Sequence, residues 1–326
     1  MPARLKEAMA QTLAGWEADL PQNWRDALGP IGDDFDRIDA GLDFEAWEPI
    51  FPARRGKTFP GQPKGAHILA AFDGIAPEGV RCMILGQDPY PEPGFATGRA
   101  FEAGNLAGWV ELDKMFSKSI RAYMQLIAAA RLGDESLSRD FARWPDVRRL
   151  LSDPTAGFES PSAIADRWVG EGVLLLNASL TLSRFRVDID PHQSRGHLPF
   201  WRPLMLRVVE RQMARGTPIV FLGFGDAAAD ILAEAGIREG LAGSIGYVQR
   251  AHPAFADRGL GHENPFLICN SYGEPCPLLL NMISLSSARA LRAASSQTAC
   301  RKTLVIACCF SKPAARIAIH SFVCRC

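Results

Sequence analysis

The sequence lacks the features that mark several common functional classes. No apolar run reaches the roughly 20 residues that a membrane helix needs. No two cysteines have CxxC spacing, and no cysteines and histidines have the spacing of zinc or iron–sulfur ligands. Neither a P-loop nor a GxGxxG motif occurs, which argues against a generic α/β nucleotide hydrolase. We therefore expect a protein without a membrane span, a metal or a cofactor.

Acidic residues are absent from the end of the chain. No Asp or Glu follows Glu274, whereas the last 52 residues contain seven basic residues and six of the eight cysteines. Because the whole chain has 36 basic and 36 acidic residues, residues 1–274 hold 29 basic and 36 acidic residues, a net charge of −7. We predict a folded domain at residues 1–274, and a basic, cysteine-rich tail at residues 275–326 that is disordered or not part of the fold.

Two further absences bear on partners and location. The net charge is zero, so the global basic excess that usually marks a DNA-binding protein is missing. Any contact with DNA must come from a local basic patch, helix N-termini or backbone N–H groups. The first 20 residues lack the apolar segment of a signal peptide and alternate charged and apolar residues. They predict an amphipathic helix in a cytoplasmic protein.

Short apolar runs of strand length alternate with segments of helical periodicity. The predicted strands are residues 80–85, 173–177, 218–222 and 245–249, and the predicted helices are residues 113–132, 203–215 and 226–235. Continuous apolar runs suit strands that are buried on both faces. This alternation predicts an α/β fold with three α/β/α layers and a central, mainly parallel four-stranded sheet. The polar region at about 133–163 predicts a helical insertion or a long connection.

Polar residues stand at the carboxyl end of each predicted strand. Gln87 and Asp88 follow the first strand, Asn177 ends the second, Gly225 follows the third, and the fourth leads to His252. In an open α/β sheet, ligands bind outside this edge. A carboxylate, an amide, a glycine turn and an imidazole at one edge therefore predict an active site.

Each of these residues also has a plain structural explanation. Asp88 stands before a proline and suits a turn, Asn177 can cap the next helix, and His252 can be a half-buried, hydrogen-bonded histidine. Gly225 can be a packing glycine and Phe101 a core residue. Only their joint placement favours a site, and placement alone does not name a substrate.

Three motifs resemble those of family 1 uracil-DNA glycosylases. Residues 86–90 read Gly-Gln-Asp-Pro-Tyr and residues 93–101 read Pro-Gly-Phe-Ala-Thr-Gly-Arg-Ala-Phe, which resembles the water-activating motif of that family. Residues 172–181, Gly-Val-Leu-Leu-Leu-Asn-Ala-Ser-Leu-Thr, resemble its uracil-recognition strand. Residues 251–253, Ala-His-Pro, are similar to the start of its DNA-intercalation loop. The resemblance extends over about residues 40–274.

The resemblance implies an enzyme that flips uracil out of single- or double-stranded DNA and hydrolyses its bond to the sugar. Asp88 would stabilise the sugar cation and orient the attacking water, and a neutral His252 would donate a hydrogen bond to uracil O2. The implied substrate-binding residues are Gln87 through its backbone, Tyr90 against C5, Phe101 as the stacking platform and Asn177 at N3–H and O4. A monomer is expected.

The sequence departs from the family pattern at two places. Pro91 stands where the family usually has a histidine, which puts a hydrogen bond near Asp88 in doubt. The intercalation loop continues Ala-Phe-Ala-Asp-Arg-Gly at residues 254–259 instead of Ser-Pro-Leu-Ser, so Phe255 or Arg258 would replace the leucine wedge. The predicted DNA contacts are Gly225, Pro253, Phe255 and Arg258. The phage-encoded inhibitor of the family grips this loop and is expected to bind poorly.

Two other functions are compatible with the same motifs. One is a uracil- or DNA-binding protein without catalysis, against which the intact Asp88, Asn177 and His252 argue. The other is a glycosylase that acts on a wider range of damaged bases, against which Tyr90 and Asn177 argue.

Overall fold

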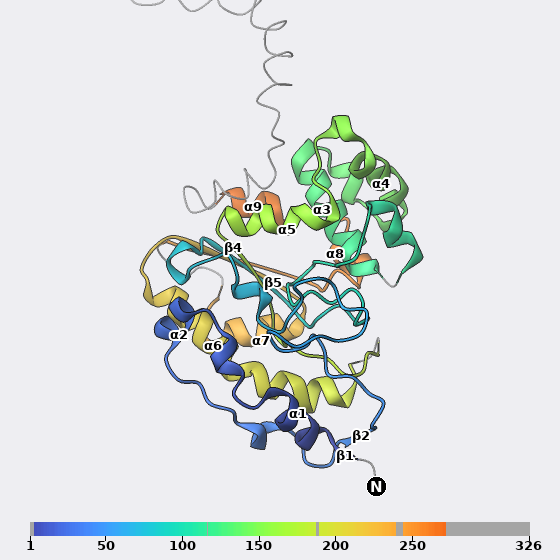
Figure 1. Ribbon diagram of the computed structural model, residues 1–326. Helices are drawn as coiled ribbons and strands as arrows, with labels where there is room; N and C mark the ends of the chain where they lie inside the picture. Colours follow the sequence, from blue (N-terminus) through green and yellow to red (C-terminus); the bar gives the residue numbers. More distant parts are fainter. Residues whose placement is uncertain (1–2, 116, 187–188, 239–243, 272–326) are drawn as a thin grey trace, which may run out of the picture. The chain divides into compact units, whose positions relative to one another are not determined.

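Four parallel strands form the central sheet (Figure 1). The computed structural model describes residues 3–115, 117–186, 189–238 and 244–271. The strands are β3 (Cys82–Gly86), β4 (Val173–Asn177), β5 (Ile219–Phe224) and β6 (Ile245–Arg250), in the order β4-β3-β5-β6. All three pairings between them are parallel. The predicted parallel four-stranded sheet is confirmed.

The sequence of each strand agrees with its place in the sheet. Every residue of β3, β4 and β5 is buried, as expected for apolar strands covered on both faces. Strand β6 lies at an edge and alternates buried and partly exposed residues. The chain goes from β3 to β4 and then returns to β5 on the other side of β3, so the strand order reverses between β3 and β5. Such a reversal opens a ligand crevice at the carboxyl edge.

Helices cover both faces of this sheet (Figure 1). The helices of one face are α3 (Lys118–Leu132), α5 (Pro161–Gly170) and α9 (Pro265–Ser271), and those of the other are α6 (Leu198–Ala214) and α7 (Asp226–Glu234). On the first face, the Tyr123 ring lies 5.8 Å from the Trp168 ring and 5.5 Å from the Phe266 ring. On the second face, Trp201 packs edge-on against Trp16 at 5.0 Å. The three predicted layers are therefore present.

The N-terminal segment differs from the single helix expected over residues 1–20. Helix α1 (Leu5–Leu13) is followed by Gly15 at φ 71°, a conformation that favours glycine, and then by a 3₁₀-helix at Trp16–Asp19. Helix α2 (Gln22–Leu28) comes next. A small antiparallel pair joins β1 (Ala3–Arg4) to β2 (Asp43–Phe44). Strands of two residues have no detectable period, so the sequence did not predict them.

The predicted helices are confirmed; α3 and α6 begin at other residues than predicted, and α7 begins at Asp226 as predicted. A 3₁₀-helix at Trp109–Lys114 precedes α3, and a π-helix at Gln193–His197 precedes α6. The predicted insertion is helical: 3₁₀-helices at Glu135–Ser138, Phe141–Arg143 and Pro154–Ala156 surround α4 (Trp144–Ser152). Helix α8 (Ala256–Gly259) follows β6. The predicted tail, residues 275–326, lies outside the described residues. Within the described ranges, no helix is both long and apolar enough to cross a membrane.

Candidate functional site

A cavity of about 70 Å³ opens at the carboxyl edge of the sheet. Its volume has room for several water molecules at ~10–15 Å³ each. It is lined by all six residues predicted to be catalytic or substrate-binding, Gln87, Asp88, Tyr90, Phe101, Asn177 and His252. The loops after β3, β4 and β6 supply these residues, so the sheet topology brings together side chains that are up to 165 positions apart in the sequence, as Gln87 and His252 are. The predicted convergence of these residues is present.

The Asn177 amide lies against the backbone of Gly86. The two residues are register partners at the ends of β4 and β3, and Asn177 is only 2% exposed. A Cβ atom at Gly86 would lie 2.6 Å from Asn177 Oδ1 and 3.4 Å from the Phe101 ring. The Gly86 carbonyl accepts a hydrogen bond from the Ala178 N–H at 2.9 Å. Glycine at position 86 is therefore required by the close approach of the amide and the ring.

Phe101 is held with one ring face available to the cavity. One face stacks on Tyr123, with centroids 4.4 Å apart and an interplanar angle of 6°. The ring edge also meets Phe224 at 5.1 Å in a T-shaped contact. Phe101 has φ 56°, which is uncommon for a residue with a side chain and occurs where surrounding packing enforces it. Because Phe101 also lines the cavity, its second face is a rigid platform for a flat ligand.

His252 is a neutral hydrogen-bond donor at physiological pH. Burial lowers the pKa of its imidazole to about 4. The Ala254 N–H donates to His252 Nδ1 at 3.3 Å, so the proton of the neutral ring belongs on Nε2. Gly225 packs beneath this side chain, since a Cβ atom there would lie 3.1 Å from His252 Cβ. Gly225 thus supports the imidazole, while its predicted contact with DNA stays a prediction.

Asp88 is a carboxyl group whose ionisation is opposed by burial. Burial raises its pKa to about 6, and hydrogen bonds from two side-chain amides act in the opposite direction. Gln87 Nε2 donates to Asp88 Oδ2 at 3.0 Å, and Gln193 Nε2 donates to the same oxygen at 3.1 Å. Asp88 therefore has two amide donors, although Pro91 stands where the family usually has a histidine.

The sequence did not predict several residues of this site. Gln193 comes from the π-helix before α6, and Phe185, which is 41% exposed, lines the cavity from the segment after β4. Arg99 and Glu102 also line it, from within the first motif. Only the last two had a signal, since they lie beside Phe101 in a stretch that was already singled out.

The predicted DNA contacts lie next to the cavity and do not line it. Phe255 is 44% exposed, and the Arg258 guanidinium lies 5.5 Å from its ring centroid. The Phe255 N–H donates to the His252 carbonyl at 2.8 Å, so the backbone of the two residues is joined in a turn. Pro253 is buried between them.

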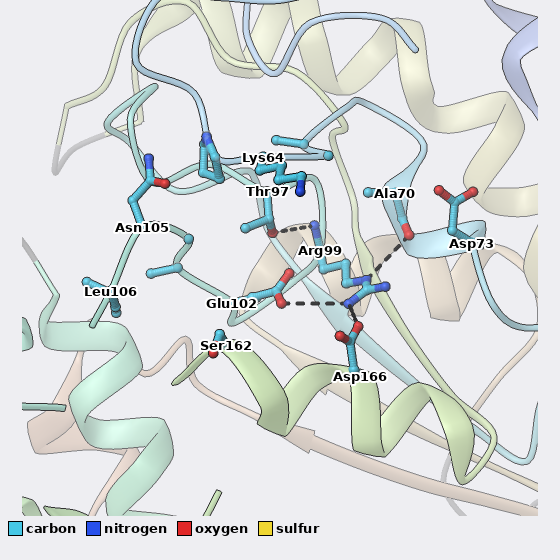
Figure 2. Close-up of a pocket in the computed structure, with 15 residues that line it drawn as sticks. Lys64, Ala70, Asp73, Thr97, Arg99, Glu102, Asn105, Leu106, Ser162 and Asp166 are labelled. Atoms are coloured by element: carbon cyan, nitrogen blue, oxygen red, sulfur yellow. Dashed lines mark hydrogen bonds and ion pairs between the residues drawn. The ribbon is translucent and has the colours of Figure 1, made fainter. Parts of the chain in front are cut away.

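A second cavity, of about 390 Å³, shares Arg99 and Glu102 with the first (Figure 2). Arg99 points toward two carboxylates, Glu102 Oε1 at 3.6 Å and Asp166 Oδ1 at 2.6 Å. Arg99 is thus already paired with acids, and none of the predicted site residues lines this cavity. Across the described part of the chain, no three His, Cys, Asp or Glu side chains are placed to hold a metal ion. The smaller cavity is the candidate active site.

Relatives with similar sequences share one name, although no family model matches the chain. Uracil-DNA glycosylase 1 of Streptomyces avermitilis is 30% identical over 253 residues, which cover 76% of this chain and 87% of that protein. Uracil-DNA glycosylase of Parafrankia sp. is 30% identical over 259 residues, covering 78% and 90%. The wild-type UNG crystal structure from Nitratifractor salsuginis superposes with a TM-score of 0.53 at 22% identity, covering 87% of this chain and 98% of that one, which supports the fold.

We predict that Gly86→Ala destabilises the protein by about 1–3 kcal/mol, because the added methyl group overlaps the Asn177 amide. Thermal unfolding measures the loss. Gly170→Ala is the control, since a Cβ atom there meets nothing within 4 Å and the residue ends a helix. Equal melting temperatures for Gly86→Ala and wild type would contradict the close approach.

Proposed function

The chain belongs to the uracil-DNA glycosylase family and is a DNA glycosylase that hydrolyses the N-glycosidic bond of deoxyuridine in DNA, and we propose that Asp88, Asn177 and His252 carry this reaction. The observation that supports these roles is that all three residues line one cavity beside the available face of Phe101. The cavity lies below the protein surface, so the base must leave the duplex to reach it, at a cost of a few kcal/mol.

Asn177 selects uracil by its hydrogen-bonding edge. Its amide oxygen accepts from N3–H and its amide nitrogen donates to O4. Cytosine presents the opposite donor and acceptor at these positions, so it would leave the buried amide unpaired. The close contact with Gly86 prevents the amide from moving to suit another base.

Two aromatic rings set the shape of the base slot. Phe101 stacks on the flipped base, a contact worth about 1–3 kcal/mol for comparable base–aromatic pairs. Tyr90 is buried, and its ring meets Phe95 at 5.8 Å in a T-shaped contact, so it cannot easily move aside. A fixed ring beside C5 rejects the methyl group of thymine by steric exclusion, which discriminates more strongly than a difference in attraction.

Cleavage of the C1′–N1 bond leaves the electron pair on uracil and a positive charge on the sugar. The Asp88 carboxylate stabilises that cation and orients a water molecule for attack at C1′; as the C1′–O bond forms, the proton that the water loses passes to Asp88, and uracil leaves as the anion. His252 donates its Nε2–H to uracil O2, where negative charge develops, and the backbone N–H of Gln87 assists at the same oxygen. A neutral imidazole suits this role, and its low pKa keeps it neutral.

The DNA-binding surface surrounds the cavity from two edges of the sheet. Phe185 follows β4 and Phe255 follows β6, and these strands are the two edges of the sheet. We assign the role of the wedge to Phe255, on which Arg258 packs. We assign contacts with the DNA strand to Pro253 and Gly225. We also propose that the protein acts as a monomer and that it is located in the cytoplasm.

We expect Asp88→Asn to lower uracil excision by about 10²–10³-fold, because a neutral amide cannot stabilise the sugar cation. Formation of abasic sites in oligonucleotides with uracil or thymine at one position measures the reaction. Asp166→Asn, which alters a carboxylate of the other cavity, is the matched control and should retain activity. Wild-type rates in Asp88→Asn would exclude the assigned role.

Phe255→Ala should slow excision from duplex DNA about tenfold more than from single strands, because only a duplex needs its vacated stack filled (~1.4 kcal/mol). Phe185→Ala is the informative comparison. This ring lines the base cavity, so its loss should affect both substrates alike. If Phe255→Ala slows both substrates equally, Arg258→Ala becomes the test of the wedge, and equal losses there as well would reject a wedge in this loop.

We also propose that the phage-encoded inhibitor of the family binds poorly, because residues 254–259 replace the loop that it grips. Titration of the inhibitor into an excision assay tests this, with a family member that carries Ser-Pro-Leu-Ser as the positive control. Full inhibition at a near-equimolar ratio would refute the proposal.

A further inference from the structure

The side-chain amide of Gln193 is aimed at Asp88 from outside the three sequence motifs. Its Nε2 donates to Asp88 Oδ2 at 3.1 Å, and the residue is 2% exposed. A carboxylate only accepts hydrogen bonds, so the amide must present its nitrogen there. The other atom of the amide, Oε1, is buried with no hydrogen-bond partner among the described residues. A buried polar atom left unpaired is unfavourable for stability, which indicates that the orientation of this amide serves another purpose.

A directed chain of buried hydrogen bonds fixes the backbone that carries Gln193. Trp201 Nε1 lies 2.8 Å from Thr181 Oγ1, which lies 2.8 Å from His197 Nδ1. His197 Nε2 lies 2.9 Å from Ser183 Oγ, which lies 2.9 Å from His192 Nδ1. The chain ends where His192 Nε2 lies 2.8 Å from the Asp43 carbonyl oxygen. An indole only donates and a carbonyl only accepts. When both imidazoles are neutral, every bond of the chain points in one direction, from the indole to the carbonyl.

The protonation of the two histidines agrees with this chain. Burial lowers the pKa of His197 to about 3, and burial also lowers the pKa of His192. His192 immediately precedes Gln193, and His197 ends the same π-helix, so both ends of the turn are held. π-Helices are rare and frequently occur at functional sites. The Gln193 amide is thus placed by a rigid, buried support.

We propose that Gln193 is a positioning residue that orients the Asp88 carboxylate and favours its ionised form. This inference rests on the role assigned to Asp88 under the proposed function. Gln193 belongs to the segment between β4 and α6, so it reaches the acid from a part of the chain that the motif around Asp88 does not include.

The groups around Asp88 determine how the loss of Gln193 would change the pKa of Asp88. The titratable or charged groups that line the same cavity are Tyr90, Arg99, Glu102 and His252. None of them is among the causes of the Asp88 pKa shift, which are burial and the two amides. Removal of the Gln193 donor should therefore raise the pKa of Asp88 above about 6. Since the carboxylate is the active form, activity should then be lost at a higher pH as the solution is acidified.

The test is the pH profile of single-turnover uracil excision by Gln193→Met, which keeps the side-chain length and removes the donor. We expect the acid limb to move upward by about half a pH unit, with a loss of about twofold at pH 6 that becomes smaller toward pH 8, and with the half-saturating concentration nearly unchanged. Gln212→Met is the matched control. Gln212 is fully buried on the neighbouring α6 and donates to the Pro77 carbonyl at 3.2 Å, away from the cavity.

A second variant covers the case in which Gln193→Met does not fold. Gln193→Glu places a second carboxyl group against Asp88, so the acid limb should move further upward through like-charge repulsion. The proposal is overturned if Asp88→Asn is inactive in this assay and a folded Gln193 variant has the same acid limb of the pH profile as the wild type. Full activity of Asp88→Asn would instead reject the role of Asp88 itself, which separates the two failures.

Discussion

Gly86 and Asn177 face each other at the ends of two buried parallel strands, and the rest of the site depends on how closely they approach. With no Cβ atom at position 86, the amide sits against the backbone of β3, and the Phe101 ring reaches the same place. The ring can hold this position at φ 56° because Tyr123 and Phe224 pack against it from the core. The slot for the base is thus an extension of the hydrophobic core, and its precision comes from core packing rather than from the loops.

Burial affects the two reactive groups in opposite ways. For His252 it is helpful, since desolvation keeps the imidazole neutral and able to donate from Nε2. For Asp88 the same desolvation is a cost, because it favours the uncharged acid over the carboxylate that the proposed mechanism needs. The two amides on Asp88 Oδ2 offset part of that cost without introducing a cation, which would repel the developing charge on the sugar. The site therefore buries its acid and still favours the anionic form with two neutral donors.

The strands, and the six predicted residues that line the cavity, could be predicted because each is marked in the sequence by a short run of consecutive residues. Apolar runs identify β3, β4 and β5, and the rule for parallel sheets then brings Asp88, Asn177 and His252 to one edge. Gln193 was not predictable, because its position depends on a π-helix held by hydrogen bonds with three other parts of the chain, β2, the segment after β4 and α6. Its only trace in the sequence is a pair of histidines that flank it. The short pairing of β1 with β2 also escapes detection, since two residues cannot show a period.

The charge distribution of the described chain explains how DNA can be contacted without a basic surface. Many arginines are already paired with acids, among them Arg184 with the buried Glu48 and Arg186 with Asp190 at 3.1 Å. Paired cations release few counterions on binding DNA, so this surface supplies little of the salt-dependent affinity that basic proteins have. Arg258 is different, because it packs on the exposed Phe255 ring beside the cavity. Under the proposed function, discrimination depends on the cavity, where a flipped base would meet Asn177 and Phe101, rather than on strong binding of the phosphate backbone.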